Sequence, residues 1–249
     1  MEKVYELENR GYQFIYHWFF LTLAGLRHLE KPGCKVKVYM PWYKDLGYHN
    51  DSLPYFSDKF EFLCSPTNRP NCPVEFFHGE SLIGHDRIAT EGYLYVREAL
   101  LRDKTYMVEK GKRVYITRTG SASLESNRGN LHHAVLNEAD LVELLTAHGF
   151  TVVRLEELNL EQKIALFRTA EVIVAPFGGG LTFTALCEPW QHVIELVSPR
   201  LSIHLHHYRI ICEELGVPYT RFEAVYTADD NLNIYVDIDE LRGTLASIL

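Results

Sequence analysis

Apolar and polar positions follow a regular pattern through the second half of the chain. Short apolar runs predict strands at residues 113–117, 151–155, 171–175 and 192–197. Apolar positions at helical spacing predict helices at residues 137–148 and 159–170, from about residue 181, and at roughly 205–215. Strands and helices that alternate with short connections form a mostly parallel sheet covered by helices, and its ligands bind at the carboxyl ends of the strands. The pattern therefore predicts an α/β domain with a binding site along one sheet edge.

The first half of the chain has a less regular pattern. The aromatic-rich apolar run from Tyr12 to Leu29 predicts a buried helix, because Lys31-Pro32-Gly33 follows it as a stop signal. Alternation over residues 35–40 predicts a strand, residues 65–73 with three prolines predict a loop, and residues 93–101 predict a helix. Charged residues around Gly111 predict a boundary near residues 105–112. We therefore expect an amino-terminal domain at 1–108 and a carboxy-terminal domain at 109–249.

Composition and charge narrow the classes of partner. The 249 residues are 47% hydrophobic and carry a formal net charge of -8, which is typical of a globular protein and argues against nucleic acid as a partner. The five cysteines include no CxxC pair, so neither a disulfide framework nor a four-cysteine zinc site is expected.

The apolar run from Trp18 to Leu26 has about half the length that a bilayer requires. Residues 1–10 are too polar for a secretory signal. We expect a cytoplasmic chain without a membrane span, although a shortened form of a Golgi or endoplasmic-reticulum enzyme would have the same sequence features.

A glycine-rich loop between a strand and a helix is the strongest local feature. The strand Val172–Ala175 runs through Pro176 and Phe177 into Gly178, Gly179 and Gly180, and a helix then opens with Leu181 and Thr182. Glycines let a ligand approach the backbone, and a helix start offers N–H groups with partial positive charge. The loop therefore suits a diphosphate, although it is neither a P-loop nor a GxGxxG fingerprint. The alternative is a tight strand-to-helix turn without a ligand.

Three charged residues accompany this loop. Arg118 ends its strand at the carboxyl edge, and Arg128 follows ten residues later; guanidinium groups make forked contacts with phosphate. Glu195 lies within the apolar strand 193–197, where a carboxylate must be paired or hydrogen-bonded, and at this edge it could accept both hydroxyls of a ribose. The alternatives are a solvated loop for the arginines and a structural ion pair for the glutamate.

Histidines are numerous, but their spacing does not predict a metal site. The clusters lack both the helical HExxH pair and a carboxylate at a motif spacing; they comprise His132 and His133, and His204, His206 and His207. We therefore expect no metal and no cofactor. For His17, inside the aromatic run, a hydrogen-bonded core histidine is the default interpretation.

Taken together, these motifs resemble glycosyltransferase family 61, which includes capsular-polysaccharide, O-GlcNAc and xylosyltransferase types. The resemblance covers about a third of the chain. A weaker similarity is His17-Trp18, which looks like the family's amino-terminal His-aromatic element. The matching segments are Tyr115–Arg118, Arg128, Leu136–Leu141, Gly149-Phe150, Leu158, Glu161-Gln162, Phe167, Ala170, Ile173–Thr182 and Val193–Leu196.

The resemblance implies a fold of the GT-B type, with two Rossmann-like lobes, a donor cleft between them and a reduced first lobe. It implies inverting transfer of xylose, another pentose or N-acetylglucosamine from a UDP-sugar to a glycan or glycoprotein, without an essential metal. It also implies a donor pocket lined by Arg118, Arg128, residues 177–182 and Glu195. One position departs from the family, which usually has His where this chain has Phe177, so a hydrogen-bond donor is lost there.

Inverting transfer requires a base that takes the acceptor's proton and groups that stabilise the departing diphosphate. The arginines and the helix start would stabilise the diphosphate, and the base would come from the first lobe. The sequence does not choose among its candidates, which are His17, His78, Asp86 and Glu91. Two other functions stay open: a catalytically silent sugar- or nucleotide-binding partner subunit, suggested by Phe177, and a nucleotide-sugar epimerase-like enzyme.

Overall fold

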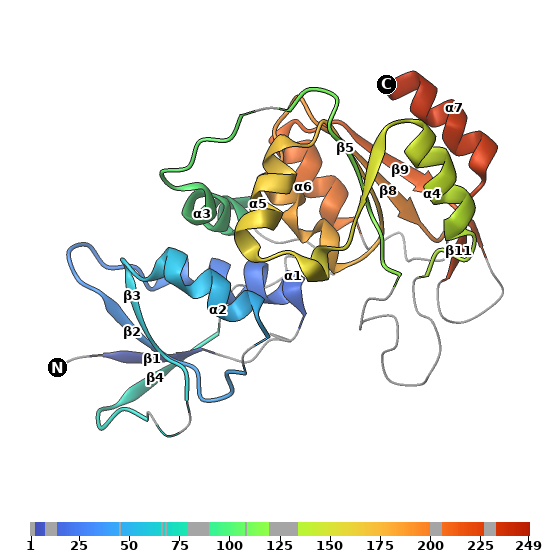
Figure 1. Ribbon diagram of the computed structural model, residues 1–249. Helices are drawn as coiled ribbons and strands as arrows, with labels where there is room; N and C mark the ends of the chain where they lie inside the picture. Colours follow the sequence, from blue (N-terminus) through green and yellow to red (C-terminus); the bar gives the residue numbers. More distant parts are fainter. Residues whose placement is uncertain are drawn as a thin grey trace. The chain divides into compact units, whose positions relative to one another are not determined.

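The computed structural model forms two compact units, Met1–Thr105 and Tyr106–Leu249, each with its own parallel sheet (Figure 1). It is a mixed α/β protein. The residues that it describes are 3–7, 14–44, 46–65, 67, 69–78, 90–107, 109–119, 134–199, 206–226 and 233–249.

The first unit contains a four-stranded sheet of order β3-β2-β1-β4, in which all neighbours are parallel. Its strands are β1 (Val4–Leu7), β2 (Val36–Tyr39), β3 (Phe60–Leu63) and β4 (Val74–Phe77). Its helices are α1 (Ile15–His17), η1 (Trp18–Leu23), η2 (Leu26–His28), α2 (Tyr48–Ser52), η3 (Leu53–Phe56) and α3 (Thr90–Leu101). The chain order changes direction between β1 and β4, so this sheet has its switch point there.

The helical segment that follows β1 differs from the single buried helix predicted for residues 12–29. Residues 12 and 13 lie outside the described residues, and from Ile15 the chain forms a short α-helix, a π-helix and a 3₁₀-helix in succession. Every residue from Trp18 to Leu23 is buried, so the burial is confirmed. The Trp18 indole donates to Ser52 Oγ at 2.8 Å and its ring lies 4.0 Å from that of His49. Six consecutive buried residues thus form a π-helix, a rare form that apolar spacing at the α-helical period does not predict.

The second unit contains a five-stranded sheet of order β6-β5-β7-β8-β9, again with only parallel neighbours. Its strands are β5 (Arg113–Ile116), β6 (Phe150–Val153), β7 (Val172–Pro176), β8 (His192–Val197) and β9 (Tyr219–Glu223). An antiparallel ribbon follows, made of β10 (Val225–Tyr226) and β11 (Ile234–Tyr235). The predicted parallel sheet is confirmed. Because β5 lies between β6 and β7, the switch point of this sheet falls between β5 and β7.

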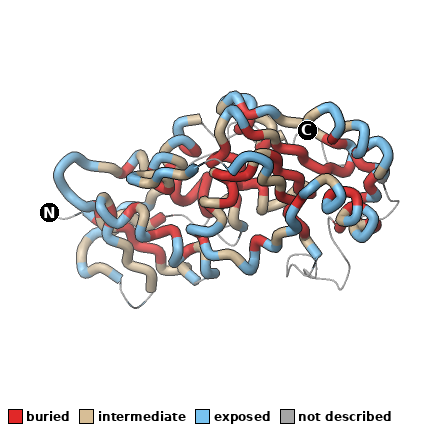
Figure 2. Tube along the Cα trace, turned by 45° about the horizontal axis from the view of Figure 1, so that its top comes forward, coloured by how far each residue is buried: buried red, intermediate tan, exposed pale blue. Residues whose placement is uncertain are grey.

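Helices cover both faces of the second sheet (Figure 1). On one face, α4 (Glu138–Ala147) and α7 (Ile238–Ile248) pack on a core that includes Val174 and Leu196. On the other face lie α5 (Leu160–Thr169), η6 (Gly179–Leu186) and α6 (His207–Leu215), with the short η5 (Leu155–Glu157) beside them. Buried segments, red in Figure 2, run through the interior and exposed turns lie outside them.

Local sequence signals explain where several helices begin. At α5 the predicted capping box is present, because Asn159 Oδ1 accepts from the Gln162 N–H and Gln162 Oε1 accepts from the Asn159 N–H, both at 2.9 Å. At α7, Asp237 accepts from two backbone N–H groups of the first turn. These caps determine where each helix begins after its strand or loop.

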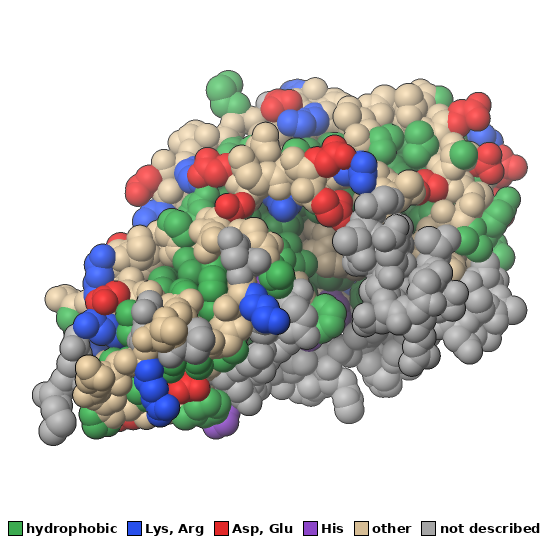
Figure 3. All heavy atoms as spheres, turned by 60° about the horizontal axis from the view of Figure 1, so that its bottom comes forward, with side chains coloured by type: hydrophobic (Ala, Val, Ile, Leu, Met, Phe, Trp, Pro, Cys, Tyr) green, Lys and Arg blue, Asp and Glu red, His purple; other side chains and the backbone are tan. Residues whose placement is uncertain are grey.

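The surface carries charges of both signs. On the face drawn in Figure 3, acidic and basic side chains are interspersed, and the described part of that face has no broad basic surface of the kind that nucleic acid binds. Among the described helices, none is both long enough and apolar enough to cross a bilayer.

Candidate functional site

The switch point of the second sheet brings together two of the predicted donor-binding elements. In the β5–β7 register Tyr115 pairs with Val174, so three residues further along Arg118 lies beside Phe177. The Arg118 Nη1 donates to the Phe177 carbonyl oxygen at 2.8 Å. Open α/β sheets bind their ligands at this place, outside the carboxyl ends of the strands on either side of the switch point. We call Arg118 together with residues 177–180 the switch-point site.

Position 178 requires a glycine for two reasons: its backbone conformation and the closeness of Arg118. Its φ of 152° and ψ of -176° belong to a region that essentially only glycine adopts. A Cβ atom there would lie 2.0 Å from Arg118 Nη1 and 3.1 Å from Arg118 Cζ. The missing side chain therefore leaves the space that the guanidinium occupies.

The helix that follows the loop begins two residues earlier than predicted and is a 3₁₀-helix, Gly179–Leu186. Its first internal bond runs from the Leu181 N–H to the Gly178 carbonyl at 3.0 Å. The N–H groups of residues 179 and 180 precede this bond, so the helix itself offers them no acceptor. A Cβ at Gly180 would lie 3.1 Å from Leu155 Cδ1 and 3.5 Å from Ile116 Cγ2. This glycine lets the helix start pack closely on β5.

Arg118 is a mostly buried cation. Burial lowers the pKa of its guanidinium, and the opposing influences of Tyr208 and Glu156 raise it. An arginine nevertheless remains charged, because the ordinary pKa of its guanidinium exceeds 12. A buried positive charge beside helix N–H groups favours an anionic ligand.

Glu195 lies on the same sheet face as Arg118, two residues before the end of β8. Its side chain is buried, and Oε2 accepts a hydrogen bond from the Tyr219 hydroxyl. No described group hydrogen-bonds Oε1. Burial raises the pKa of Glu195 to about 7, while the Tyr219 hydrogen bond and the charge of Arg221 lower it.

Tyr208 of α6 belongs to the same cluster, and the sequence motifs did not identify it. Burial and the Glu195 charge raise the Tyr208 pKa, while Thr182 and Arg118 lower it. The Phe177 ring lies 5.8 Å from the Tyr208 ring and 6.0 Å from that of His207. Helical periodicity could predict that Tyr208 is buried, but not that it contacts residues of two other segments.

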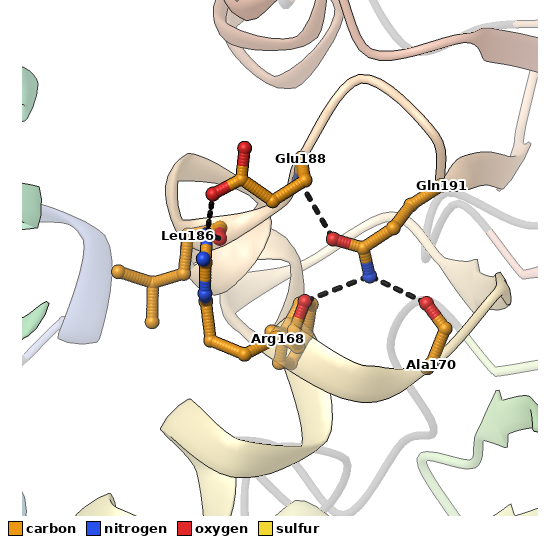
Figure 4. A network of polar contacts seen from close by, with 6 residues as sticks. Arg168, Ala170, Leu186, Glu188 and Gln191 are labelled. Carbon is orange, nitrogen blue, oxygen red and sulfur yellow. Dashed lines mark hydrogen bonds and ion pairs between the residues drawn. The ribbon is translucent and has the colours of Figure 1, made fainter. Parts of the chain in front are cut away.

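A polar network holds the far end of η6 (Figure 4). Arg168 on α5 donates to the Leu186 carbonyl at 3.0 Å and forms an ion pair with Glu188. Gln191 accepts from the Glu188 N–H at 2.7 Å and donates to carbonyls at the end of α5, including that of Ala170 at 2.5 Å. The helix that begins in the switch-point site is thus fixed to α5 at its other end.

The remaining predicted residues belong to the first unit or fall outside the described residues. Arg128 and Asp86 fall outside the described residues. His78 directly follows β4 at the carboxyl edge of the first sheet, beside its switch point, and its ring lies 5.0 Å from that of Phe76. His17 ends α1 and is half-buried between Phe14 and Tyr16. Glu91 is exposed in the first turn of α3.

In the described ranges, no three His, Cys, Asp or Glu side chains gather closely enough to hold an ion.

These features define a class of protein: an α/β protein with a buried cation and a glycine-rich loop at the switch point of a parallel sheet, where nucleotides bind. The family model described as Glycosyltransferase 61 matches residues 15–194. The chain therefore belongs to the glycosyltransferase 61 family, and the predicted resemblance is confirmed.

Two solved structures are similar to this chain. One is the bacterial iron-containing dodecameric glycosyltransferase TibC from enterotoxigenic E. coli H10407, with a TM-score of 0.49 and 11% identity over 92% of this chain and 63% of TibC. The other is the TibC heptosyltransferase in complex with ADP-D-beta-D-heptose, with a TM-score of 0.41 and 12% identity over 92% of this chain and 64% of TibC. The chain thus spans less than two thirds of the length of TibC. No curated protein matches the chain in sequence.

Proposed function

We propose that this chain transfers a sugar from a UDP-sugar donor to a glycan or glycoprotein acceptor, with inversion and without a metal ion. The donor sugar would be xylose, another pentose or N-acetylglucosamine. The observation that carries the proposal is the position of Arg118 against Gly178 at the switch point of the second sheet. Membership of the glycosyltransferase 61 family supports the same reaction class.

The switch-point site has the chemistry that a departing nucleoside diphosphate needs. Negative charge develops on the diphosphate as the bond to the sugar breaks, and fixed positive groups stabilise it. Arg118 supplies a guanidinium, and the first N–H groups of η6 supply helix-terminal donors. In this proposal they do the work that a divalent ion does in other enzymes, with Arg128 as a second cation.

Glu195 is the proposed acceptor for the ribose hydroxyls. It lies on the Arg118 face of the sheet, and among the described groups none bonds its Oε1. Ribose hydroxyls that donate to the carboxylate would favour its charged form and lower the pKa from about 7. Donor binding should therefore release part of a proton from this group near neutral pH.

We further propose a two-lobed arrangement of the GT-B type, in which the first unit supplies the base. His78 is the first candidate to test, because it follows β4 beside the switch point of the first sheet. An imidazole is suited to proton transfer near neutral pH. His17, Glu91 and Asp86 are the other candidates.

Calorimetric titration with UDP tests the donor site. Arg118→Ala should weaken UDP binding by about ten- to a hundredfold, since it removes charge-assisted hydrogen bonds to the diphosphate. Glu195→Gln should weaken it less, because the amide still accepts a hydrogen bond and the diphosphate contact stays intact. Arg242→Ala is the matched control: this arginine is exposed on α7 and pairs with Asp239. Equal affinities of wild type and Arg118→Ala would reject the assignment.

Phe177 supports a second candidate function, a catalytically silent nucleotide-binding subunit. Its ring lies against the rings of Tyr208 and His207 and offers no hydrogen bond to a donor sugar. Incubation of the protein with a panel of UDP-sugars, followed by detection of released UDP, separates the two functions. Turnover of any donor favours the transferase, whereas UDP binding without turnover of any donor or acceptor favours the silent subunit.

A further inference from the structure

The strand end that carries Arg118 also carries three hydroxyl groups on its opposite face. Side chains alternate along an extended strand, so Tyr115, Thr117 and Thr119 share one face and Arg118 points to the other. The contacts agree: Tyr115 belongs to the core under α4 and α7, whereas Arg118 bonds Phe177 on the η6 side. The Thr117 N–H donates to the Val153 carbonyl at 3.0 Å, which continues the ladder beyond β5.

All three hydroxyls donate to one carboxylate, that of Glu138. The Tyr115 hydroxyl reaches Oε1 at 2.7 Å, the Thr117 hydroxyl reaches the same oxygen, and the Thr119 hydroxyl reaches Oε2. The Thr119 N–H also donates to Thr117 Oγ1 at 3.0 Å. One acidic side chain thus binds three successive positions on the same face of the strand end.

The backbone around Glu138 is itself fixed. Glu138 is the first residue of α4, where the partial positive charge of the helix start favours a carboxylate. The preceding Asn137 pairs its amide with the backbone of Val236, donating to the carbonyl and accepting from the N–H, each at 2.9 Å. The carboxylate therefore projects from a helix end that is attached to the segment before α7.

We propose that Glu138 is the positioning residue for Arg118. By holding the hydroxyls of residues 117 and 119 on the far face, it fixes the backbone between them and directs the guanidinium toward Gly178. Glu138 itself lies on the opposite face of the sheet from Arg118 and is not one of the residues proposed to bind the UDP-sugar. The inference deepens the proposed function and rests on it for its consequence in UDP binding, but not for its structural content.

Two variants remove the contact to different degrees. Glu138→Gln keeps the shape of the side chain but removes its negative charge. It also replaces one carboxylate oxygen, an acceptor, with an amide NH₂ group, a donor. Thr119→Val is nearly isosteric and removes a single, exposed hydroxyl. It can therefore be measured even if Glu138→Gln fails to fold. The matched control is Glu143→Gln, an exposed residue on the same helix.

The rate of chemical modification measures the accessibility of Arg118 without any ligand. Phenylglyoxal reacts with accessible guanidinium groups, and peptide mass mapping resolves each arginine. We expect Arg118 to react at least about threefold faster in Glu138→Gln and in Thr119→Val, because local opening exposes the guanidinium. Arg168, whose ion pair with Glu188 is remote from Glu138, is the internal reference and should not change. An unchanged Arg118 rate in the folded variants overturns the proposal.

A double-mutant cycle measures how Glu138 and Arg118 together affect the affinity for UDP. Glu138→Gln alone should weaken UDP binding about five- to tenfold, through displacement of the Arg118 hydrogen bonds. In the Arg118→Ala background the same change should have almost no further effect, because the two residues act in series. Additive losses mean that Glu138 supports the fold without positioning Arg118, and they also overturn the proposal.

The two readouts separate this inference from the proposed function. If wild type fails to bind UDP, the proposed function fails, and the modification rates alone decide whether Glu138 positions Arg118. If wild type binds UDP and the Arg118 rate is insensitive to Glu138, the proposed function stands and the inference fails.

Discussion

Arg118 and Glu195 are opposite charges on the same face of one sheet, and burial disfavours the charged form of each. The pKa of Arg118 is lowered, but a guanidinium has so high an ordinary pKa that it stays protonated. The pKa of Glu195 is raised from 4.5 to about 7, so near neutral pH the carboxylate is only partly ionised. The protein therefore retains a permanent, partly buried cation and a buried acid that titrates near neutral pH.

This shift predicts a pH dependence of stability. Between pH 4.5 and about 7 the folded state holds the Glu195 proton more tightly than the unfolded state, so the free energy of unfolding falls as the pH rises through that window. The full loss is on the order of 3 kcal/mol from a shift of this size. Glu195→Gln removes it. Urea unfolding at pH 5 and pH 8 should show the variant gaining stability over wild type at the higher pH.

The control for this measurement is Glu143→Gln, which changes an exposed carboxylate by the same chemistry. It should leave the pH dependence of wild type unchanged. Parallel stability–pH curves for wild type and Glu195→Gln would mean that Tyr219 and Arg221 compensate the buried charge fully.

The sequence alone could identify Arg118 and Glu195 as candidate site residues, because each is a charged side chain in apolar surroundings. A charged side chain at the end of an apolar strand, or within one, stands out locally, so Arg118 and Glu195 could be selected from their neighbours alone. Tyr208 and Tyr219 could not, because an amphipathic helix and an edge strand present tyrosines without any local signal. The proposed role of Glu138 depends on hydroxyls that lie 21 and 23 residues earlier in the chain and that only the fold brings within reach.

At the scale of elements, the joint between β7 and η6 determines the geometry of the site. The strand ends at Pro176, and the 3₁₀-helix begins at Gly179, with two residues between them. Gly178 makes this turn in a backbone conformation that other residues essentially do not adopt, and its open side receives the Arg118 guanidinium. The joint thus couples the direction of η6 to the position of the cation.

Gly178→Ala should disturb both parts of this joint. The backbone strain costs on the order of 1–3 kcal/mol, and the new Cβ would overlap Arg118 Nη1, which must move. We expect a lower melting temperature and a loss of UDP affinity at least as large as that of Arg118→Ala. The control is Gly243→Ala within α7, where a Cβ meets open space; it should stabilise the helix by about 0.5–1 kcal/mol. Wild-type UDP affinity in Gly178→Ala would contradict the coupling.

Element prediction succeeded where the pattern was long and capped. The strand over residues 192–197 and the helix after Asn159 agree with the structure within a residue or two. The predicted start of η6 lies two residues too late, because three glycines carry no helix signal of their own. In the first unit, strands of four residues separate short and irregular helices, so β1, β3 and β4 gave too little periodicity to be recognised.

At the scale of the whole molecule, the proposed function divides its chemistry between the two units. Each has a parallel sheet whose strand order changes direction once, and each switch point has a predicted functional residue beside it: His78 in the first unit and Arg118 in the second. Sequence alternation could predict the parallel sheet, but the strand order depends on which strands pair, and that is a non-local property.

This division predicts that residues 106–249 alone bind the nucleotide. The described donor residues, which are Arg118, the 177–182 segment and Glu195, all lie in this unit, and it has its own core over α4 and α7. A fragment 106–249 should unfold cooperatively and bind UDP within about threefold of the intact chain, since its contacts are preserved. It should hydrolyse no UDP-sugar, because the proposed base is missing. Arg118→Ala in the fragment should weaken the binding by about ten- to a hundredfold, as in the intact chain. A folded fragment that does not bind UDP would show that the first unit supplies part of the donor site.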